Sequence, residues 1–196
     1  WSRGHEGTAV ITPDRWADMP EDARAACIPS PPASVDRFHF AYERSTPDAQ
    51  STDVGLRTLG GFVGALNGSG YLGLMRQLVG DERVNKVDGA FSRYRRGHYL
   101  SPHTDANKDQ VRLVAHVIAL TPQWQQSWGG TLTLCSVDGT PEASLPPKFN
   151  TLVLFEVPRW HYVSPVRTDA SRYSFFGWLV ERDIEMSNTD ATQVVG

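Results

Sequence analysis

The chain has 196 residues, of which 40% are hydrophobic and 21% charged, as expected of one folded globular domain. Nineteen basic and 22 acidic residues give a formal charge of −3, which provides no electrostatic reason to bind nucleic acid or an anionic membrane. Cys27 and Cys135 are too few for a disulfide framework or a zinc site, and no apolar run approaches the roughly 20 residues that span a bilayer. We therefore expect one domain over 1–196 in the cytoplasm, with no nucleic acid or membrane partner and an oligomeric state that the sequence leaves unknown.

The first third of the chain is predicted to hold supporting elements. Residues 13–27 favour one or two short helical turns. The alternation over 35–42 predicts a strand, and the polar stretch 44–53 predicts a loop. Apolar residues recur at intervals of three and four over 71–79, which predicts an amphipathic helix ended by Gly80.

The rest of the chain is typical of β structure. Strand-like runs separated by Gly, Pro, Asn and Asp turns lie at 87–101, 111–120, 130–136, 151–157, 161–166 and 172–181. Many short strands indicate an antiparallel sandwich or barrel, here with helices packed outside. We expect a mainly β (α+β) domain in which 1–86 form N-terminal helical and strand support, 87–181 the core and 182–196 a tail.

His103, Thr104 and Asp105 form the most informative local motif. Residues two apart on a strand point to the same face, so this imidazole and this carboxylate could bind one metal ion. His161, which begins a late strand, is the best candidate for a third ligand. Two imidazoles and one carboxylate form the facial triad of non-haem iron(II) oxygenases. Taken alone, the motif also fits a chance occurrence, and His161 a structural histidine.

Arg172 begins an apolar strand, where a guanidinium is costly to bury unless a carboxylate pairs with it. Its planar fork suits bidentate recognition of a carboxylate. Ser174 shares the same strand face and could donate a hydrogen bond to the same group. The alternative is a pairing of Arg172 with Asp169 or another surface acid.

An ordered set of motifs then carries a family resemblance: Tyr94, His103-Thr104-Asp105, Trp128-Gly129-Gly130-Thr131-Leu132, Phe149-Asn150, Phe155, His161, Ser164-Pro165-Val166, Arg172-Tyr173-Ser174 and Gly177-Trp178. In this order over 87–181, the set resembles the Fe(II)- and 2-oxoglutarate-dependent dioxygenases, nearest their prolyl 4-hydroxylase-like branch. The resemblance implies a double-stranded β-helix, the cupin-like jelly roll, with iron at one mouth.

The resemblance also implies roles for six residues and a set of cofactors. The iron ligands and catalytic residues would be His103, Asp105 and His161; the residues that bind the cosubstrate 2-oxoglutarate would be Arg172, Ser174 and Tyr94. Fe(II), 2-oxoglutarate and O2 are the implied cofactors, with ascorbate open as an auxiliary. Halogenation, which needs a small residue in place of the carboxylate ligand, is disfavoured because Asp105 is present.

The implied activity is hydroxylation of an unactivated C–H bond in an amino acid, or in a prolyl-like residue of a peptide or protein. One alternative is a tailoring oxygenase that hydroxylates, desaturates or epoxidises a small-molecule natural product. Another is a non-catalytic cupin-like binding module, although a structural metal would need no carboxylate clamp of Arg172 and Ser174. Substrate contacts are less defined: Arg93, Arg95 or Arg96 could hold a substrate carboxylate, but arginines on an exposed strand are usually solvated.

Overall fold

The computed structural model describes residues 2–4, 18–20, 23 and 38–181. The helical turns expected over 13–27 fall almost wholly outside these residues, as do Cys27 and the tail 182–196. The elements of the described part are β1 (Ser2–Gly4), β2 (Phe40–Ser45), α3 (Val54–Leu66), α4 (Ser69–Val79), β3 (Lys86–Tyr94), β4 (Tyr99–His103), β5 (Arg112–Ala119), the 3-10 helix η1 (Gln126–Trp128), β6 (Leu132–Cys135), β7 (Pro141–Leu145), β8 (Thr151–Glu156), β9 (His161–Val163) and β10 (Arg172–Val180).

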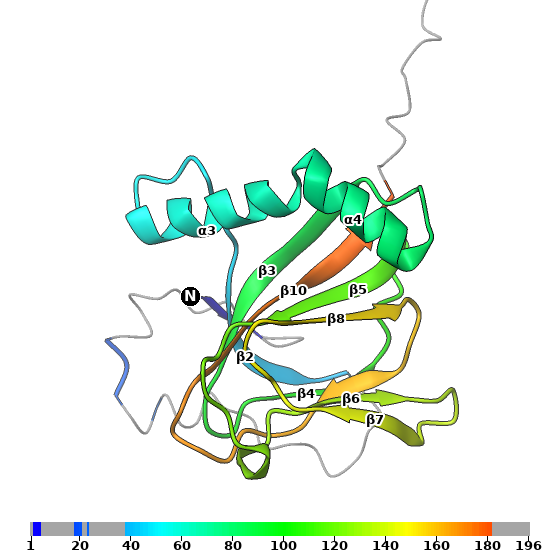
Figure 1. Cartoon of the computed structure of the whole chain (residues 1–196). Coiled ribbons are helices and arrows are strands. Elements are labelled where there is room, and N and C mark those ends of the chain that lie inside the picture. Colours follow the sequence, from blue (N-terminus) through cyan, green and yellow to red (C-terminus); the bar gives the residue numbers. More distant parts are fainter. Residues whose placement is uncertain (1, 5–17, 21–22, 24–37, 182–196) are drawn as a thin grey trace, which may run out of the picture.

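Antiparallel pairing joins the strands into one curled sheet with the order β7-β6-β9-β4-β2-β3-β10-β5-β8, and β1 pairs with β2 (Figure 1). Strand β2 is the corner of this sheet, because Phe40 and Ala41 pair with β4 whereas residues 43–45 pair with β3. The sheet therefore folds into two layers, β3-β10-β5-β8 and β4-β9-β6-β7. The predicted mainly β architecture is confirmed.

Helices α3 and α4 cover the outer face of the first layer (Figure 1). Helix α4 ends as predicted at Gly80, whose φ of 68° is the left-handed conformation that glycine adopts at low cost. Helix α3 was not predicted, since its glycines lower helix propensity and interrupt the apolar stripe. Asp53 caps it, because the carboxylate accepts from the backbone N–H of Leu56 at 2.8 Å.

One core cluster lies between the helices and the first layer, and a second lies between the two layers. The first contains Leu66, Leu72, Met75, Val84, Val87, Phe91, Val114, Phe175 and Leu179. The second contains Tyr94, Ala115, Leu132, Phe155, Val163 and Val166. No helix in the described part of the chain is both long and apolar enough to cross a membrane.

Three strand predictions were wrong in detail. The run 87–101 is two strands, β3 and β4, because the chain turns at 95–98, where Gly97 has a φ of 80°. Strand β2 runs on to Ser45, into the stretch expected as a loop. Strand β7 was missed, since its residues are mostly exposed and carry no clear alternation of apolar and polar side chains.

Candidate active site

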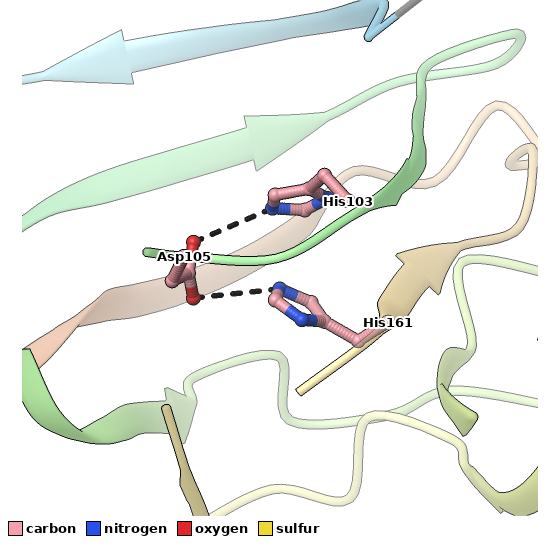
Figure 2. A group of neighbouring side chains, drawn as sticks. All are labelled: His103, Asp105 and His161. Carbon is pink, nitrogen blue, oxygen red and sulfur yellow. Dashed lines mark ion pairs between the residues drawn. The ribbon is translucent and has the colours of Figure 1, made fainter. Parts of the chain in front are cut away.

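The three predicted metal ligands converge at one end of the space between the layers. His103 ends β4 and His161 begins β9, and these two residues are direct partners in the antiparallel register. Asp105 lies two residues beyond the end of β4, in the loop rather than on the strand, and its carboxylate faces both imidazoles (Figure 2). The Nε2 atoms of His103 and His161 lie 3.4 and 3.5 Å from its two carboxylate oxygens. One ligand atom from each residue lies within 4.8 Å of the others.

Hydrogen bonds orient both imidazoles for metal binding. Nδ1 of His103 is 2.9 Å from the carbonyl oxygen of Ser101, and Nδ1 of His161 is 2.8 Å from that of Arg159. A carbonyl can only accept, so each Nδ1 carries the proton and donates it. Each Nε2 is then left with a lone pair that faces the carboxylate, which is the tautomer that a metal requires.

The charges at this site suit a divalent cation. Burial acts to raise the pKa of Asp105, but its interactions with His103, His161 and Trp178 together hold that pKa below the usual value. Burial, followed by the neighbouring His103, lowers the pKa of His161. A carboxylate and two imidazoles fit a borderline metal such as Fe(II).

Arg172 points into the same space from the start of β10. Its side chain is buried with 4% exposure, and its guanidinium donates from Nη1 to Oγ of Ser174 at 3.3 Å. Burial lowers its pKa, partly opposed by Tyr94. Among the described residues, no hydrogen-bond partner is found for Nε of Arg172. The alternative pairing with Asp169 is wrong, because Asp169 binds Arg96 at the surface.

Tyr94 forms the wall beside this guanidinium. The Cζ atom of Arg172 lies 5.0 Å from the centroid of its ring, and Tyr42 stacks on it at 4.9 Å. Burial raises the pKa of Tyr94 well above its usual range and that of Tyr42 to about 12, so both remain hydroxyl donors at neutral pH. Ser92 extends the polar cluster, since its Oγ lies 2.8 Å from that of Ser174.

All six predicted site residues line one cavity of about 310 Å³. Sequence reasoning missed several other lining residues, among them Phe38, Tyr42, Arg44, Arg112 and Trp178. The alternation over 35–42 was a usable signal, because it placed Phe38, Phe40 and Tyr42 on one strand face. No pattern indicated Arg44 or Arg112. Phe38 lies against the metal end of the cavity, with its ring centroid 4.8 Å from that of His103.

The Trp128-Gly129-Gly130 motif lies beside the side chain of Arg172. Gly130 has a φ of 64°, and a Cβ there would lie 3.1 Å from Cδ of Arg172. Trp124 donates from Nε1 to the carbonyl of Gly129 at 2.8 Å and packs edge-on against Trp128. The motif thus leaves room for the guanidinium and fixes the loop beside it.

Comparisons with known proteins agree with this geometry. The model of the 2OG-Fe(II) oxygenase superfamily matches residues 89–180, the stretch that supplies all six predicted site residues. Residues 89–180 of the chain are therefore similar to this superfamily. This similarity implies Fe(II), 2-oxoglutarate and O2 as cofactors. The triad is a set of residues that would bind Fe(II), and the buried arginine is a residue that would bind 2-oxoglutarate.

The chain is also similar to prolyl hydroxylases. It is 40% identical over 106 residues to the prolyl 3-hydroxylase OGFOD1 of Xenopus laevis and 34% identical over 101 residues to that of Mus musculus. The match covers 50% and 47% of this chain but only 20% and 18% of those relatives. A prolyl-4-hydroxylase structure from Pseudomonas putida superposes with a TM-score of 0.56 at 22% identity, covering 83% of this chain and 82% of that one. This likeness confirms the double-stranded β-helix.

Proposed function

We propose that this chain is an Fe(II)- and 2-oxoglutarate-dependent oxygenase that hydroxylates an unactivated C–H bond, most simply in a prolyl-like residue of a peptide or protein. One observation carries the proposal: His103, Asp105 and His161 converge on a single point in a cavity that also holds Arg172. This buried guanidinium has an Nε that finds no hydrogen-bond partner in the described part of the chain. A structural metal site would need the triad but not the arginine.

The residues divide into two groups by role. His103, Asp105 and His161 would hold the iron, which with 2-oxoglutarate supplies the oxidation of the substrate by O2. Arg172 would receive the distal carboxylate of 2-oxoglutarate, and its Nε would gain a partner that residues 38–181 do not supply. Ser174 and Tyr94 would add hydrogen bonds to that carboxylate. The second core cluster excludes water around it, which strengthens the ion pair.

The substrate class is inferred from the relatives and the cavity. The curated relatives are named prolyl 3-hydroxylases, although this chain spans only about a fifth of their length. Phe38, Phe40 and Trp178 give the cavity an aromatic lining that suits a compact, apolar ring such as that of proline. We also propose the division into support (1–86), core (87–181) and tail (182–196), and a cytoplasmic location on the basis of the sparse cysteines.

The test is turnover. The purified chain is loaded without oxygen with Fe(II) and 2-oxoglutarate and exposed to air with proline-containing peptides, free amino acids and a cell extract. Mass spectrometry should find one added oxygen in a substrate, in equal amount to the succinate formed. A tailoring oxygenase would instead oxidise a small molecule in the extract, and a binding module would form no succinate.

Asp105→Ala provides the decisive variant and Asp109→Ala its control. Asp109 is an exposed acid in the same loop, so both variants remove one carboxylate but only one removes a proposed ligand. We expect Asp105→Ala to abolish succinate formation and Asp109→Ala to retain it. Unchanged turnover in Asp105→Ala would overturn the proposed ligand set.

A further inference from the structure

Arg44 and Arg112 line the same cavity as the proposed metal ligands, although they come from strands that are separated by β3 and β10 in the sheet. Arg44 lies on β2, two residues after Tyr42 and on the same strand face. Arg112 begins β5, on the far side of β3 and β10. Besides Arg172, two further guanidiniums therefore face a cavity that is otherwise mainly aromatic and aliphatic.

The aromatic residues of β10 position both side chains. The Cζ atom of Arg112 lies 3.4 Å from the ring centroid of Trp178, and that of Arg44 lies 5.7 Å from the ring centroid of Phe176. Phe176 and Trp178 are two residues apart on β10 and contact each other edge-on, with centroids 6.3 Å apart. The two arginines thus lie over neighbouring rings of one aromatic surface.

Arg112 is also held by hydrogen bonds. Its Nη1 donates to the backbone carbonyl of Asp105 at 3.2 Å, and its Nε to Oε1 of Gln110 at 3.4 Å. These acceptors are neutral. Burial lowers the pKa of Arg112; the carboxylates of Asp105 and Asp88 act against that shift, and the charge of Arg44 adds to it. The guanidinium stays charged, and it is near enough to Arg44 for the two cations to repel each other.

The two carboxylates near Arg112 have other binding partners. Asp105 would give its charge to the metal, and Asp88 accepts from Nε2 of Gln110 at 3.2 Å. A divalent ion bound by the triad would add positive charge beside Arg112. An anion bound there would relieve the repulsion between the two guanidiniums.

The arginines that the sequence first suggested for this role are committed elsewhere. Arg93 and Arg95 both pair with the buried carboxylate of Glu43, and Arg96 pairs with Asp169. None of the three lines the cavity.

We propose that Arg44 and Arg112 form a subsite that holds a carboxylate of the substrate while the target C–H bond lies beside the metal. This inference rests on the proposed function and narrows its substrate class. The carboxylate is either the α-carboxylate of a free amino acid or an acidic side chain near the target residue in a peptide. Both sources present the same planar group to the guanidiniums.

The test measures binding without turnover, on the chain loaded with Mn(II) and 2-oxoglutarate under argon. One arm compares proline with prolinamide. The other arm uses four pentapeptides with a central proline and with both termini blocked. Each carries a single Asp, at one of the two positions before or the two positions after the proline, and each is compared with the peptide that has Asn in its place. Calorimetry should show at least one acid probe binding about 10-fold or more tightly than its amide, as expected of a charge-assisted hydrogen bond. The arm that shows this preference identifies the source of the carboxylate.

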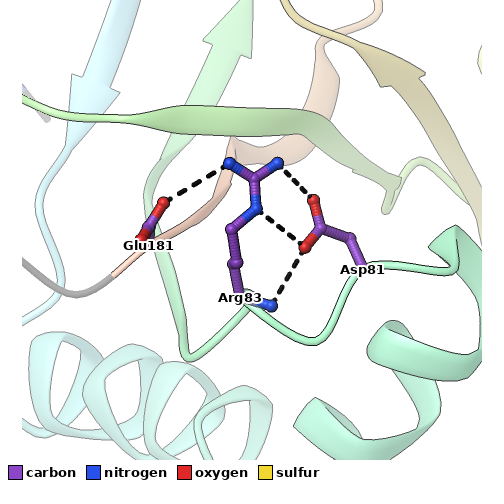
Figure 3. A network of polar contacts seen from close by, with 3 residues as sticks. All are labelled: Asp81, Arg83 and Glu181. Carbon is purple, nitrogen blue, oxygen red and sulfur yellow. Dashed lines mark hydrogen bonds and ion pairs between the residues drawn. The ribbon is translucent and has the colours of Figure 1, made fainter.

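Arg44→Gln should remove most of this preference, because it deletes one guanidinium while keeping a polar side chain. Arg83→Gln is the matched control: Arg83 is exposed and binds Asp81 and Glu181 (Figure 3), and it does not line the cavity. It should keep the full preference. Equal binding of acid and amide in every pair, or an unchanged preference in Arg44→Gln, would overturn the subsite. Because no oxidation is measured, these results do not depend on whether the chain forms succinate.

Discussion

Arg172 is the residue whose state differs most between the free protein and the proposed complex. Its guanidinium is buried, yet its polar contacts are a ring face and a hydroxyl rather than an acid. Burying a cation in this way is unfavourable, and a carboxylate ligand would offset the cost. The side chain is thus prepared for an anionic ligand before that ligand arrives.

Replacement of this guanidinium should therefore act on the cosubstrate and not on the metal. We predict that Arg172→Gln weakens 2-oxoglutarate binding about 100-fold, in the range found when one partner of a buried ion pair is removed. Mn(II) affinity should stay unchanged, since Arg172 is not among the three grouped metal-binding side chains. Titration calorimetry measures both, with the exposed Arg167→Gln as control. Unaltered 2-oxoglutarate affinity would show that another residue binds the cosubstrate.

A second prediction concerns the glycine behind this arginine. Gly130→Ala introduces a side chain at a φ of 64° and brings its Cβ to 3.1 Å from Cδ of Arg172 and from Cγ2 of Val166. Gly139→Ala introduces the same kind of backbone strain at a φ of 85°, but its Cβ meets no atom within 4 Å. Each should lower the free energy of unfolding by about 1–2 kcal/mol. Only Gly130→Ala should also weaken 2-oxoglutarate binding, and equal affinities in the two variants would contradict this.

Among the elements, the contact between α4 and β5 contains a buried titratable pair. The hydroxyl of Tyr71 on α4 lies 2.6 Å from Nε2 of His116 on β5, whose side chain is fully buried. Burial lowers the pKa of His116 from 6.5 to about 4. The histidine is therefore structural and lies on the helix-facing side of the first layer.

This pair predicts a loss of stability in acid. The unfolded chain takes up a proton on His116 below about pH 6.5 and the folded chain only near 4, so acidification through this window favours unfolding. The full shift corresponds to as much as about 3 kcal/mol. His116→Gln keeps a hydrogen-bonding partner for Tyr71 but does not titrate. Urea unfolding at pH 7 and pH 4.5 should show a smaller loss for the variant, and equal losses would assign the acid sensitivity to other groups.

For the whole molecule, the sequence predicted the elements whose pattern is local. The strands with apolar runs and the helix ended by Gly80 were recognised, because period and capping are read from neighbouring residues. The pairing of His103 with His161 was expected from the order of motifs, although no local pattern gives the register that joins residues 58 positions apart. Arg44 and Arg112 were missed for the same reason, since only the curled sheet brings β2 and β5 around one cavity.

The convergence of distant segments at one site also predicts how the protein with bound metal and cosubstrate should respond to heat. The three proposed metal ligands join β4, β9 and the loop that leads to β5, so a bound ion would cross-link elements that are distant in sequence. A ligand at 100 times its Kd adds about 2.7 kcal/mol to the free energy of unfolding, which for a chain of this size raises Tm by about 5–10 °C. We predict this rise on adding Mn(II) with 2-oxoglutarate under argon, followed by differential scanning calorimetry, and its reversal by EDTA. Asp105→Ala should show no rise, whereas Asp109→Ala should match the wild type. A rise that persists in Asp105→Ala would place the metal at other ligands.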